Sequence, residues 1–372
     1  MPERNTMKKI QELQQVKGDA YDYYIAGNED TDLFEKIFLV DDIVEEICKP
    51  DKYFLIGEKG SGKTAYSVYM SKSDKINSFC SISLVENTLY QRFLNMKRQK
   101  ALELSSFKDV WINLIYLILA EKIRKEYGET FFSSIKYKQL SKAIDVFYSD
   151  AFKPEFVNAF EFVDNASASI NSMMKQGLFS TGTKASAETS QKYVEQSFQI
   201  SLLKIRDGFE KAFMSVNLKK PTILFVDGID ARPRDIDNEQ YFECLVGLVN
   251  AVLEMNQSFL KEKQIKIMLL IRPDIMYKMP VHNMNQKLRN NSVLLNWVTS
   301  YRKYIDSKLF KIADDYFMKQ QDYSYELGEC WNYYFPYKVE YQEKWKAPDN
   351  PFVEFLRYSL YKPRDILTML NE

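Results

Sequence analysis

Histidine is almost absent from this sequence, and what is missing narrows the classes of function. His282 is the single histidine among 372 residues, which excludes mechanisms and metal sites that need two imidazoles from one chain and disfavours serine–histidine hydrolysis. The four cysteines contain no C-x-x-C pair, so neither a disulfide framework nor a zinc site is indicated. We expect buried thiols at all four positions: Cys48, Cys80, Cys244 and Cys330.

The sequence also has no net charge, little glycine and proline, and no long apolar run. Basic and acidic residues number 51 each, so bulk charge gives no reason to expect nucleic acid or an anionic membrane as a partner. The longest apolar run, Val110 to Ala120, is interrupted by Asn113 and is too short to cross a bilayer. The N-terminus has no apolar signal core, so we expect a cytoplasmic protein. With 12 Gly and 11 Pro against 25 Tyr and 25 Phe, long helices around a large interior are favoured.

Apolar patterning predicts an α/β fold in which helices alternate with short buried strands. A helical pattern runs from Leu33 to Ile47, until Pro50 stops it. Further helices are expected from Lys63 onward, in a stripe that begins at Phe107, and between two later strands at 242–253. Four apolar runs have the length and composition of strands buried in a parallel sheet: 53–56, 78–85, 222–227 and 266–271. No strand is expected after about Asn291.

A glycine-rich loop lies between the first expected strand and the helix that starts at Lys63. It reads G-E-K-G-S-G-K-T and matches G-x-x-x-x-G-K-[ST], the Walker A motif. Glycines let consecutive main-chain amides point at phosphate oxygens, while the helix N-terminus adds favourable partial charge. Lys63 is expected to reach the β- and γ-phosphates, and the Thr64 hydroxyl to bind Mg²⁺. The expected nucleotide-binding residues are Gly57, Glu58, Lys59, Gly60, Ser61, Gly62, Lys63, Thr64 and Ala65.

Three charged residues that follow later strands complete the expected site. Asp227 ends the strand 222–227 and is the expected Mg²⁺ partner, although a turn aspartate before Gly228 would look the same. Asp230 could orient the attacking water, or pair with a nearby loop arginine. Arg272 ends the next strand and could sense the γ-phosphate, or pair with Asp274.

The C-terminal part supplies one more candidate and an aromatic stretch. Arg364, in K-P-R-D, could stabilise developing charge from a lid or from a neighbouring subunit. Aromatic residues crowd the stretch from Tyr323 to Trp345. They could stack on bases, form a protein interface, or pack the C-terminal part against the core. No site is assigned there.

These patterns divide the chain into three parts. Residues 1–50 form a helical lead-in, 51–300 a P-loop core, and 301–372 a helical, aromatic-rich lid. The core carries a large helical insertion at about 86–218. Within that insertion, 165–190 is rich in Ser, Ala, Gly and Thr, which is typical of a flexible loop or small hairpin.

Five segments together resemble a known family over nearly the whole chain. They are F-L-I-G-E-K-G-S-G-K-T, I-L-F-V-D-G-I-D, M-L-L-I-R-P-D-I, N-S-V-L-L-N-W and Y-K-P-R-D-I-L, and they resemble the bacterial FunZ-like P-loop ATPases. The D-G-I-D and I-R-P segments are also similar to the NACHT and KAP branches of the STAND-type signalling ATPases. The resemblance implies an ASCE-type core, ATP and Mg²⁺, and bacterial antiviral defence against phage as a setting.

The same resemblance sets expectations about rate and length. Those branches usually carry an acid after the final aspartate, where this chain has Ala231, so slow hydrolysis is expected. The chain also ends sooner than the resemblance leads us to expect, which predicts a truncated sequence.

Three hypotheses about function follow. The first is an ATPase in which Lys63, Thr64, Asp227 and Asp230 hydrolyse Mg·ATP and a lid responds through Arg272 and Arg364. The second is an ATP-gated homo-oligomer or complex with a protein effector, with little hydrolysis. The third, a nucleic-acid-stimulated ATPase, lacks a supporting basic segment. Adenine is preferred because the N-K-x-D guanine motif is missing.

Overall fold

The chain forms two compact units, each assembled from segments far apart in the sequence. The structure is a computed structural model that describes residues 7–25, 28–85, 107–132, 137–150, 202–229, 238–279, 288–340 and 349–372. The first unit comprises Met1–Lys49, Leu55–Ile76 and Val293–Glu372, and the second comprises Pro50–Phe54 and Asn77–Ser292. The three-part division of the chain stays a prediction.

Five parallel strands form one sheet flanked by helices, which confirms the α/β fold. The strand order is β2-β3-β4-β1-β5. The strands are β1 (Phe54–Ile56), β2 (Phe79–Leu84), β3 (Thr222–Asp227), β4 (Ile265–Ile271) and β5 (Ser292–Leu294). β2 pairs with β3 along their whole length, from Phe79 opposite Thr222 to Leu84 opposite Asp227. Every residue of β3 and β4 is buried, as in a parallel sheet covered on both faces.

The fifth strand corrects the expectation that no strand follows Asn291. β5 has only three residues, and unlike the equally short β1 it does not lead into a recognisable loop motif. Beyond it, the Leu295 N–H donates to the Ile56 carbonyl at 2.8 Å. The four strands expected from the sequence are confirmed.

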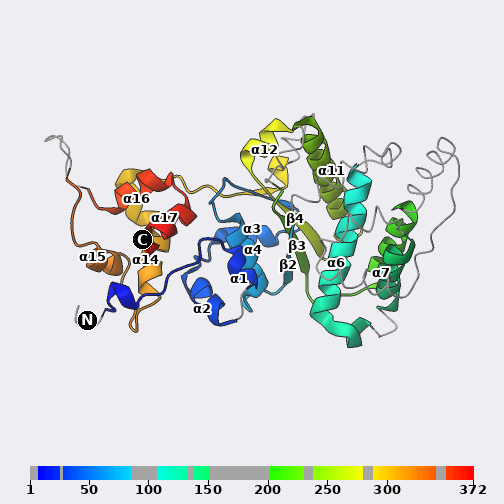
Figure 1. The fold of residues 1–372 in the computed structure, drawn as a ribbon, viewed down its shortest axis with the longest axis horizontal. Coiled ribbons are helices and arrows are strands. Elements are labelled where there is room, and N and C mark those ends of the chain that lie inside the picture. Colours follow the sequence, from blue (N-terminus) through cyan, green and yellow to red (C-terminus); the bar gives the residue numbers. More distant parts are fainter. Residues whose placement is uncertain are drawn as a thin grey trace, which may run out of the picture. The chain divides into compact units, whose positions relative to one another are not determined.

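Two long helices of the second unit lie side by side (Figure 1), α6 (Phe107–Phe132) and α11 (Asn238–Gln257). The Trp111 indole N–H donates to the Cys244 carbonyl at 3.1 Å. A Cβ at Gly247 would lie 2.6 Å from the Phe107 Cβ, so the backbones approach closely there. The sequence predicted one apolar stripe on α6, but residues 110–120 are buried on every side, because α7 (Lys138–Asp150) packs on α6 as well.

The helix expected from Leu33 to Ile47 is in fact two helices in the first unit. α2 (Asn28–Ile37) and α3 (Asp42–Cys48) are separated by residues 38–41. The Asp41 carboxylate caps α3 by accepting from the Ile43 N–H at 3.1 Å. It also accepts from the Tyr66 hydroxyl at 2.9 Å. Periodicity alone missed the break, although an aspartate before an apolar run is a helix-start signal.

The N-terminal and C-terminal segments share one apolar core in the first unit. Met7 and Val16 are buried with residues of the last helices, including Trp331 and Phe352. The Asn371 side chain donates to the Val16 carbonyl at 2.7 Å and accepts from the Val16 N–H at 3.2 Å. Besides the helix that follows the glycine-rich loop, the described helical elements of this unit are η2 (Ile10–Glu12), α1 (Tyr21–Ile25), α2, α3, η3 (Tyr301–Asp306), α14 (Lys308–Met318), α15 (Glu329–Tyr334), α16 (Phe352–Ser359) and α17 (Pro363–Asn371).

Part of the aromatic stretch packs in the apolar core that the N-terminal and C-terminal segments share, while its packing against the P-loop core stays a prediction. Trp331 is fully buried and stacks on Phe335 with ring centroids 4.3 Å apart. The buried Asp314 carboxylate accepts from the Gly328 and Trp331 amides, both at 2.8 Å, and so caps α15. Tyr323 and Tyr337 are exposed, while Tyr341 and Trp345 lie outside the described residues.

Three of the four cysteines are buried as expected, and one is not. Cys80, Cys244 and Cys330 are buried, whereas Cys48 is exposed because it ends α3 at the surface. Over the described ranges, no helix combines the length and apolar character needed to cross a bilayer. The loop or hairpin expected at 165–190 lies outside the described residues.

Candidate functional site

The glycine-rich loop joins β1 to α4 (Lys63–Lys72) in the first unit. Gly60 and Gly62 have φ values of 84° and 93°, a left-handed conformation that glycine adopts without steric cost. Gly62 is the N-cap of α4, and as a glycine it has no side chain with which to cap the helix. The N-cap position of α4 therefore lacks the usual side-chain acceptor, a feature typical of an anion-binding helix start.

Lys63 folds back over the loop that precedes it. Its ammonium group donates to the carbonyls of Gly57 at 2.8 Å and Glu58 at 3.1 Å. Only 8% of the residue is exposed, so the cation is held inside the loop rather than in solvent. The carbonyls that it contacts are neutral acceptors, and an anion in the loop would be a stronger partner for it.

Ser61 places a buried hydroxyl in the same loop. The residue is 3% exposed, and among the described residues its Oγ has no hydrogen-bond partner. A Cβ at Gly57 would collide with this hydroxyl, so the Ser61 side chain would have to shift if Gly57 were replaced. A buried hydroxyl without a partner is costly unless something polar satisfies it.

The remaining residues of the expected nucleotide-binding set differ in their exposure to solvent. Glu58 and Lys59 are exposed, whereas Thr64 and Ala65 are half-buried in the first turn of α4. The Ser67 hydroxyl donates to the Thr64 carbonyl at 2.8 Å, which ties this turn to the next one.

C-terminal residues of the first unit line the loop. The Trp297 indole N–H donates to the Ser61 carbonyl at 2.8 Å, and the Arg364 main-chain N–H donates to the Gly60 carbonyl at 3.3 Å. The Arg364 guanidinium lies beside Gly60, where an added Cβ would be 3.2 Å from Nη2. Arg364 was a candidate from the sequence, but Trp297 was not. The segment that contains Trp297 is part of the family resemblance, but nothing in its sequence predicts a contact with the loop.

Asp227 ends β3 in the second unit. The residue is 8% exposed, and its Oδ1 accepts from the Gly228 N–H at 2.7 Å. Gly228 has a φ of 83°, and a Cβ there would lie 2.9 Å from the Val85 carbonyl oxygen, so only glycine fits. Thr64 belongs to the first unit and Asp227 to the second, and their sharing of Mg²⁺ stays a prediction.

Arg272 is among the residues that the structure describes, whereas Asp230 is not. Arg272 is the N-cap of α12 (Pro273–Lys278) and donates to both carboxylate oxygens of Asp274, at 2.9 and 2.8 Å. The pairing considered as an alternative therefore exists, and a γ-phosphate contact stays a prediction. Asp230 lies outside the described residues, and its role also stays a prediction.

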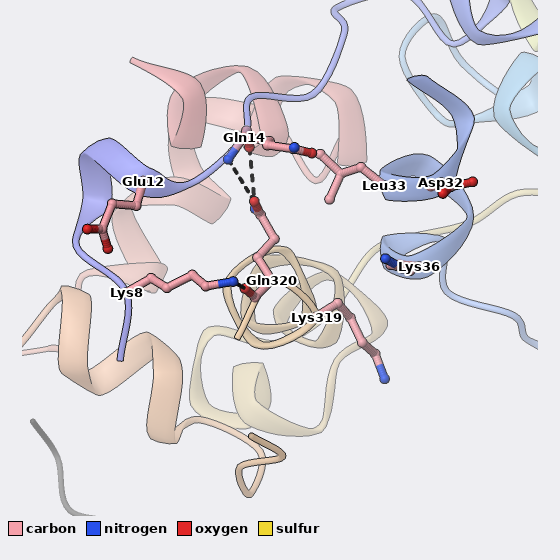
Figure 2. A pocket seen from close by; sticks show the side chains of 8 residues that line it. All are labelled: Lys8, Glu12, Gln14, Asp32, Leu33, Lys36, Lys319 and Gln320. Atoms are coloured by element: carbon pink, nitrogen blue, oxygen red, sulfur yellow. Dashed lines mark hydrogen bonds between the residues drawn. The ribbon is translucent and has the colours of Figure 1, made fainter. Parts of the chain in front are cut away.

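A hollow of about 290 Å³ lies in the first unit, and none of the candidate residues lines it (Figure 2). Its charged side chains are of both signs: Lys8, Glu12, Asp32, Lys36 and Lys319. Two hydrogen bonds, of 2.7 and 3.3 Å, join Gln14 to Gln320 beside it. Because the charges are mixed, this hollow lacks the one-signed field that favours a phosphate.

Metal ligands of the thiol, imidazole or carboxylate kind do not cluster in the described part of the chain, where no group of three or more such residues could hold an ion. A Mg²⁺ held by a hydroxyl, a carboxylate, phosphate oxygens and water would need no such group. Comparisons with known proteins found no matching family model, no matching curated protein and no matching solved structure.

Proposed function

We propose that this protein binds Mg·ATP in the loop 57–64 and hydrolyses it, so that the nucleotide switches its conformation or assembly state. The observation that carries the proposal is the construction of the loop. Two left-handed glycines precede a helix whose N-cap residue has no side chain, a buried lysine folds over the loop, and the buried Ser61 hydroxyl has no partner among the described residues. A triphosphate would satisfy all of these groups at once.

The proposed chemistry is phosphoryl transfer to water. Lys63 would exchange the carbonyls of Gly57 and Glu58 for β- and γ-phosphate oxygens, where the attraction between opposite charges adds to the hydrogen bond. Water would attack the γ-phosphorus while the bond to the bridging oxygen breaks. Asp230 is the proposed acceptor of the proton from water. Mg²⁺, when bound, neutralises charge on the β- and γ-oxygens, and Thr64 and Asp227 are its proposed ligands.

The strand order supports the assignment. β1, β3 and β4 are parallel members of one sheet. The loop follows β1, Asp227 is the last residue of β3, and Arg272 follows β4. In open parallel sheets, ligands bind outside the carboxyl ends of the strands. The resemblance to ASCE-type ATPases, and a setting in phage defence, belong to this proposal.

Steady-state ATP hydrolysis by the wild type and by Lys63→Ala tests the proposal. We expect the substitution to lower turnover about a hundredfold or more, because it removes the cation that stabilises transferred charge. Lys72→Ala is the matched control, because Lys72 ends the same helix about two and a half turns from Lys63. GTP in place of ATP tests the adenine preference. Equal rates in the wild type and Lys63→Ala would remove the assignment.

A second candidate, an ATP-gated assembly with little hydrolysis, is favoured by one observation. Glutamate is the commoner residue after the metal-binding acid, but here that position is Gly228, where the Val85 carbonyl leaves no room for a side chain. ATP would then act by stabilising one assembly state. Gel filtration with and without ATP distinguishes the candidates. Identical elution would argue against gating.

A further inference from the structure

Two successive carbonyls of the phosphate loop are held by residues from the C-terminal part of the chain. The Gly60 carbonyl accepts from the Arg364 main-chain N–H at 3.3 Å, and the Ser61 carbonyl accepts from the Trp297 indole at 2.8 Å. The second bond is the shorter one, and it comes from a side chain that can be replaced. It joins residues 236 positions apart in the sequence.

The bond from Trp297 determines how the next amide is oriented. In a trans peptide the carbonyl and the following N–H point in opposite directions, and no described peptide is cis. Because Trp297 lies outside the loop and holds the Ser61 carbonyl, the Gly62 N–H points away from Trp297. Gly62 is also the N-cap of α4, so this amide belongs to the group expected to meet the phosphates.

The position of Trp297 is itself set by the sheet. Leu295 is held by the hydrogen bond from its N–H to the Ile56 carbonyl, at 2.8 Å, directly beyond β5. Its Cβ would lie 3.1 Å from a Cβ at Gly57, so the chain passes close to the start of the loop. Trp297 follows two residues later, half-buried, with its indole N–H at Ser61.

We propose that Trp297 is a positioning residue for the phosphate loop, in which its indole N–H fixes the Ser61–Gly62 peptide so that the Gly62 amide is preset for a phosphate. This inference rests on the proposed function, because it concerns the same site. Presetting an amide removes an ordering cost that the ligand would otherwise meet. The role belongs to the donor N–H and not to the aromatic ring.

Trp297→Phe tests the donor because it keeps an aromatic ring and removes the N–H. We expect the dissociation constant of Mg·ATP to rise about three- to tenfold, as the loss of one neutral hydrogen bond implies. Trp111→Phe is the matched control. It deletes the same kind of bond, from an indole to the Cys244 carbonyl at 3.1 Å in the second unit, and it should leave ATP affinity unchanged.

Two further readouts separate positioning from general stability. Trp297→His retains a ring N–H and should recover part of the affinity lost in Trp297→Phe. The thermal midpoint of Trp297→Phe without ATP should fall no further than that of Trp111→Phe, because Trp111 is the more buried of the two. Unequal ATP affinity between Trp297→Phe and Trp297→His, with similar midpoints, supports the positioning role.

The possible failures of the two proposals are distinguishable. A wild-type protein that binds no ATP overturns the proposed function and the positioning role together. A wild type that binds ATP with the same affinity as Trp297→Phe overturns the positioning role alone. Equal losses in Trp297→Phe and Trp297→His also overturn the role of the donor, since the ring N–H would then not matter.

Discussion

Replacing Gly247 by alanine should destabilise the protein, although the same change in most helices is stabilising. Gly247 is a buried residue of α11, and glycine in a helix interior costs about 1 kcal/mol relative to alanine. A new Cβ would, however, lie 2.6 Å from the Phe107 Cβ and 3.0 Å from the Lys108 nitrogen. Backbone atoms cannot rotate aside, so α6 and α11 would have to separate. Overpacking of this kind costs about 1–3 kcal/mol, occasionally more.

The matched control is Gly208→Ala. Gly208 also lies in a helical stretch, 202–215, but nothing lies within 4 Å of a Cβ placed there. We expect this variant to gain about 0.5–1 kcal/mol, and Gly247→Ala to be about 1–3 kcal/mol less stable than Gly208→Ala, which is a net loss of up to about 2 kcal/mol relative to the wild type. Urea denaturation followed by far-ultraviolet circular dichroism gives both values. If Gly247→Ala is as stable as Gly208→Ala, the close approach of α6 and α11 is refuted.

Two further predictions concern buried and charged groups of the second unit. Asn256→Ala should lower the free energy of unfolding by about 2–5 kcal/mol. The Asn256 side-chain amide accepts from the Ile267 N–H at 2.9 Å and donates to the Ile267 carbonyl at 2.8 Å, so both buried groups would lose their partner. A loss below about 1 kcal/mol in urea denaturation would contradict this. Burial alone raises the pKa of the Glu254 carboxyl, but bonds and charges from Lys108 and Arg206 outweigh it and hold the pKa below its ordinary value. The carboxylate therefore contributes stability above the unfolded-state pKa of about 4.3, and this contribution is lost as pH falls through the lower folded-state value. Glu254→Gln should lose less stability than the wild type between neutral and acid pH, and parallel pH profiles of the two would show that the ion pairs contribute nothing.

The elements that the sequence predicts correctly depend on residues close together in the chain. The strand, loop and helix around Gly57 to Lys63 follow from one short motif and its flanking apolar pattern, and β1 and α4 lie where they were expected. The buried runs that became β3 and β4 were equally clear, because a parallel sheet covered on both faces leaves continuous apolar segments.

What the sequence could not predict was set by contacts between distant segments. Trp297 meets Ser61 across 236 residues, and Asn371 meets Val16 across 355. A periodic pattern contains no information about such pairs. The three residues of β5 gave too short a signal to be recognised as a strand.

Equilibrium binding of ATP and of adenosine to the wild-type protein, in the presence of Mg²⁺, tests the central claim most directly. If the loop amides and Lys63 hold phosphates, ATP should bind saturably with one molecule per chain, while adenosine should bind far more weakly. Calorimetric titration measures both. Equal affinity for the two ligands, or no saturable binding of ATP, would contradict the account.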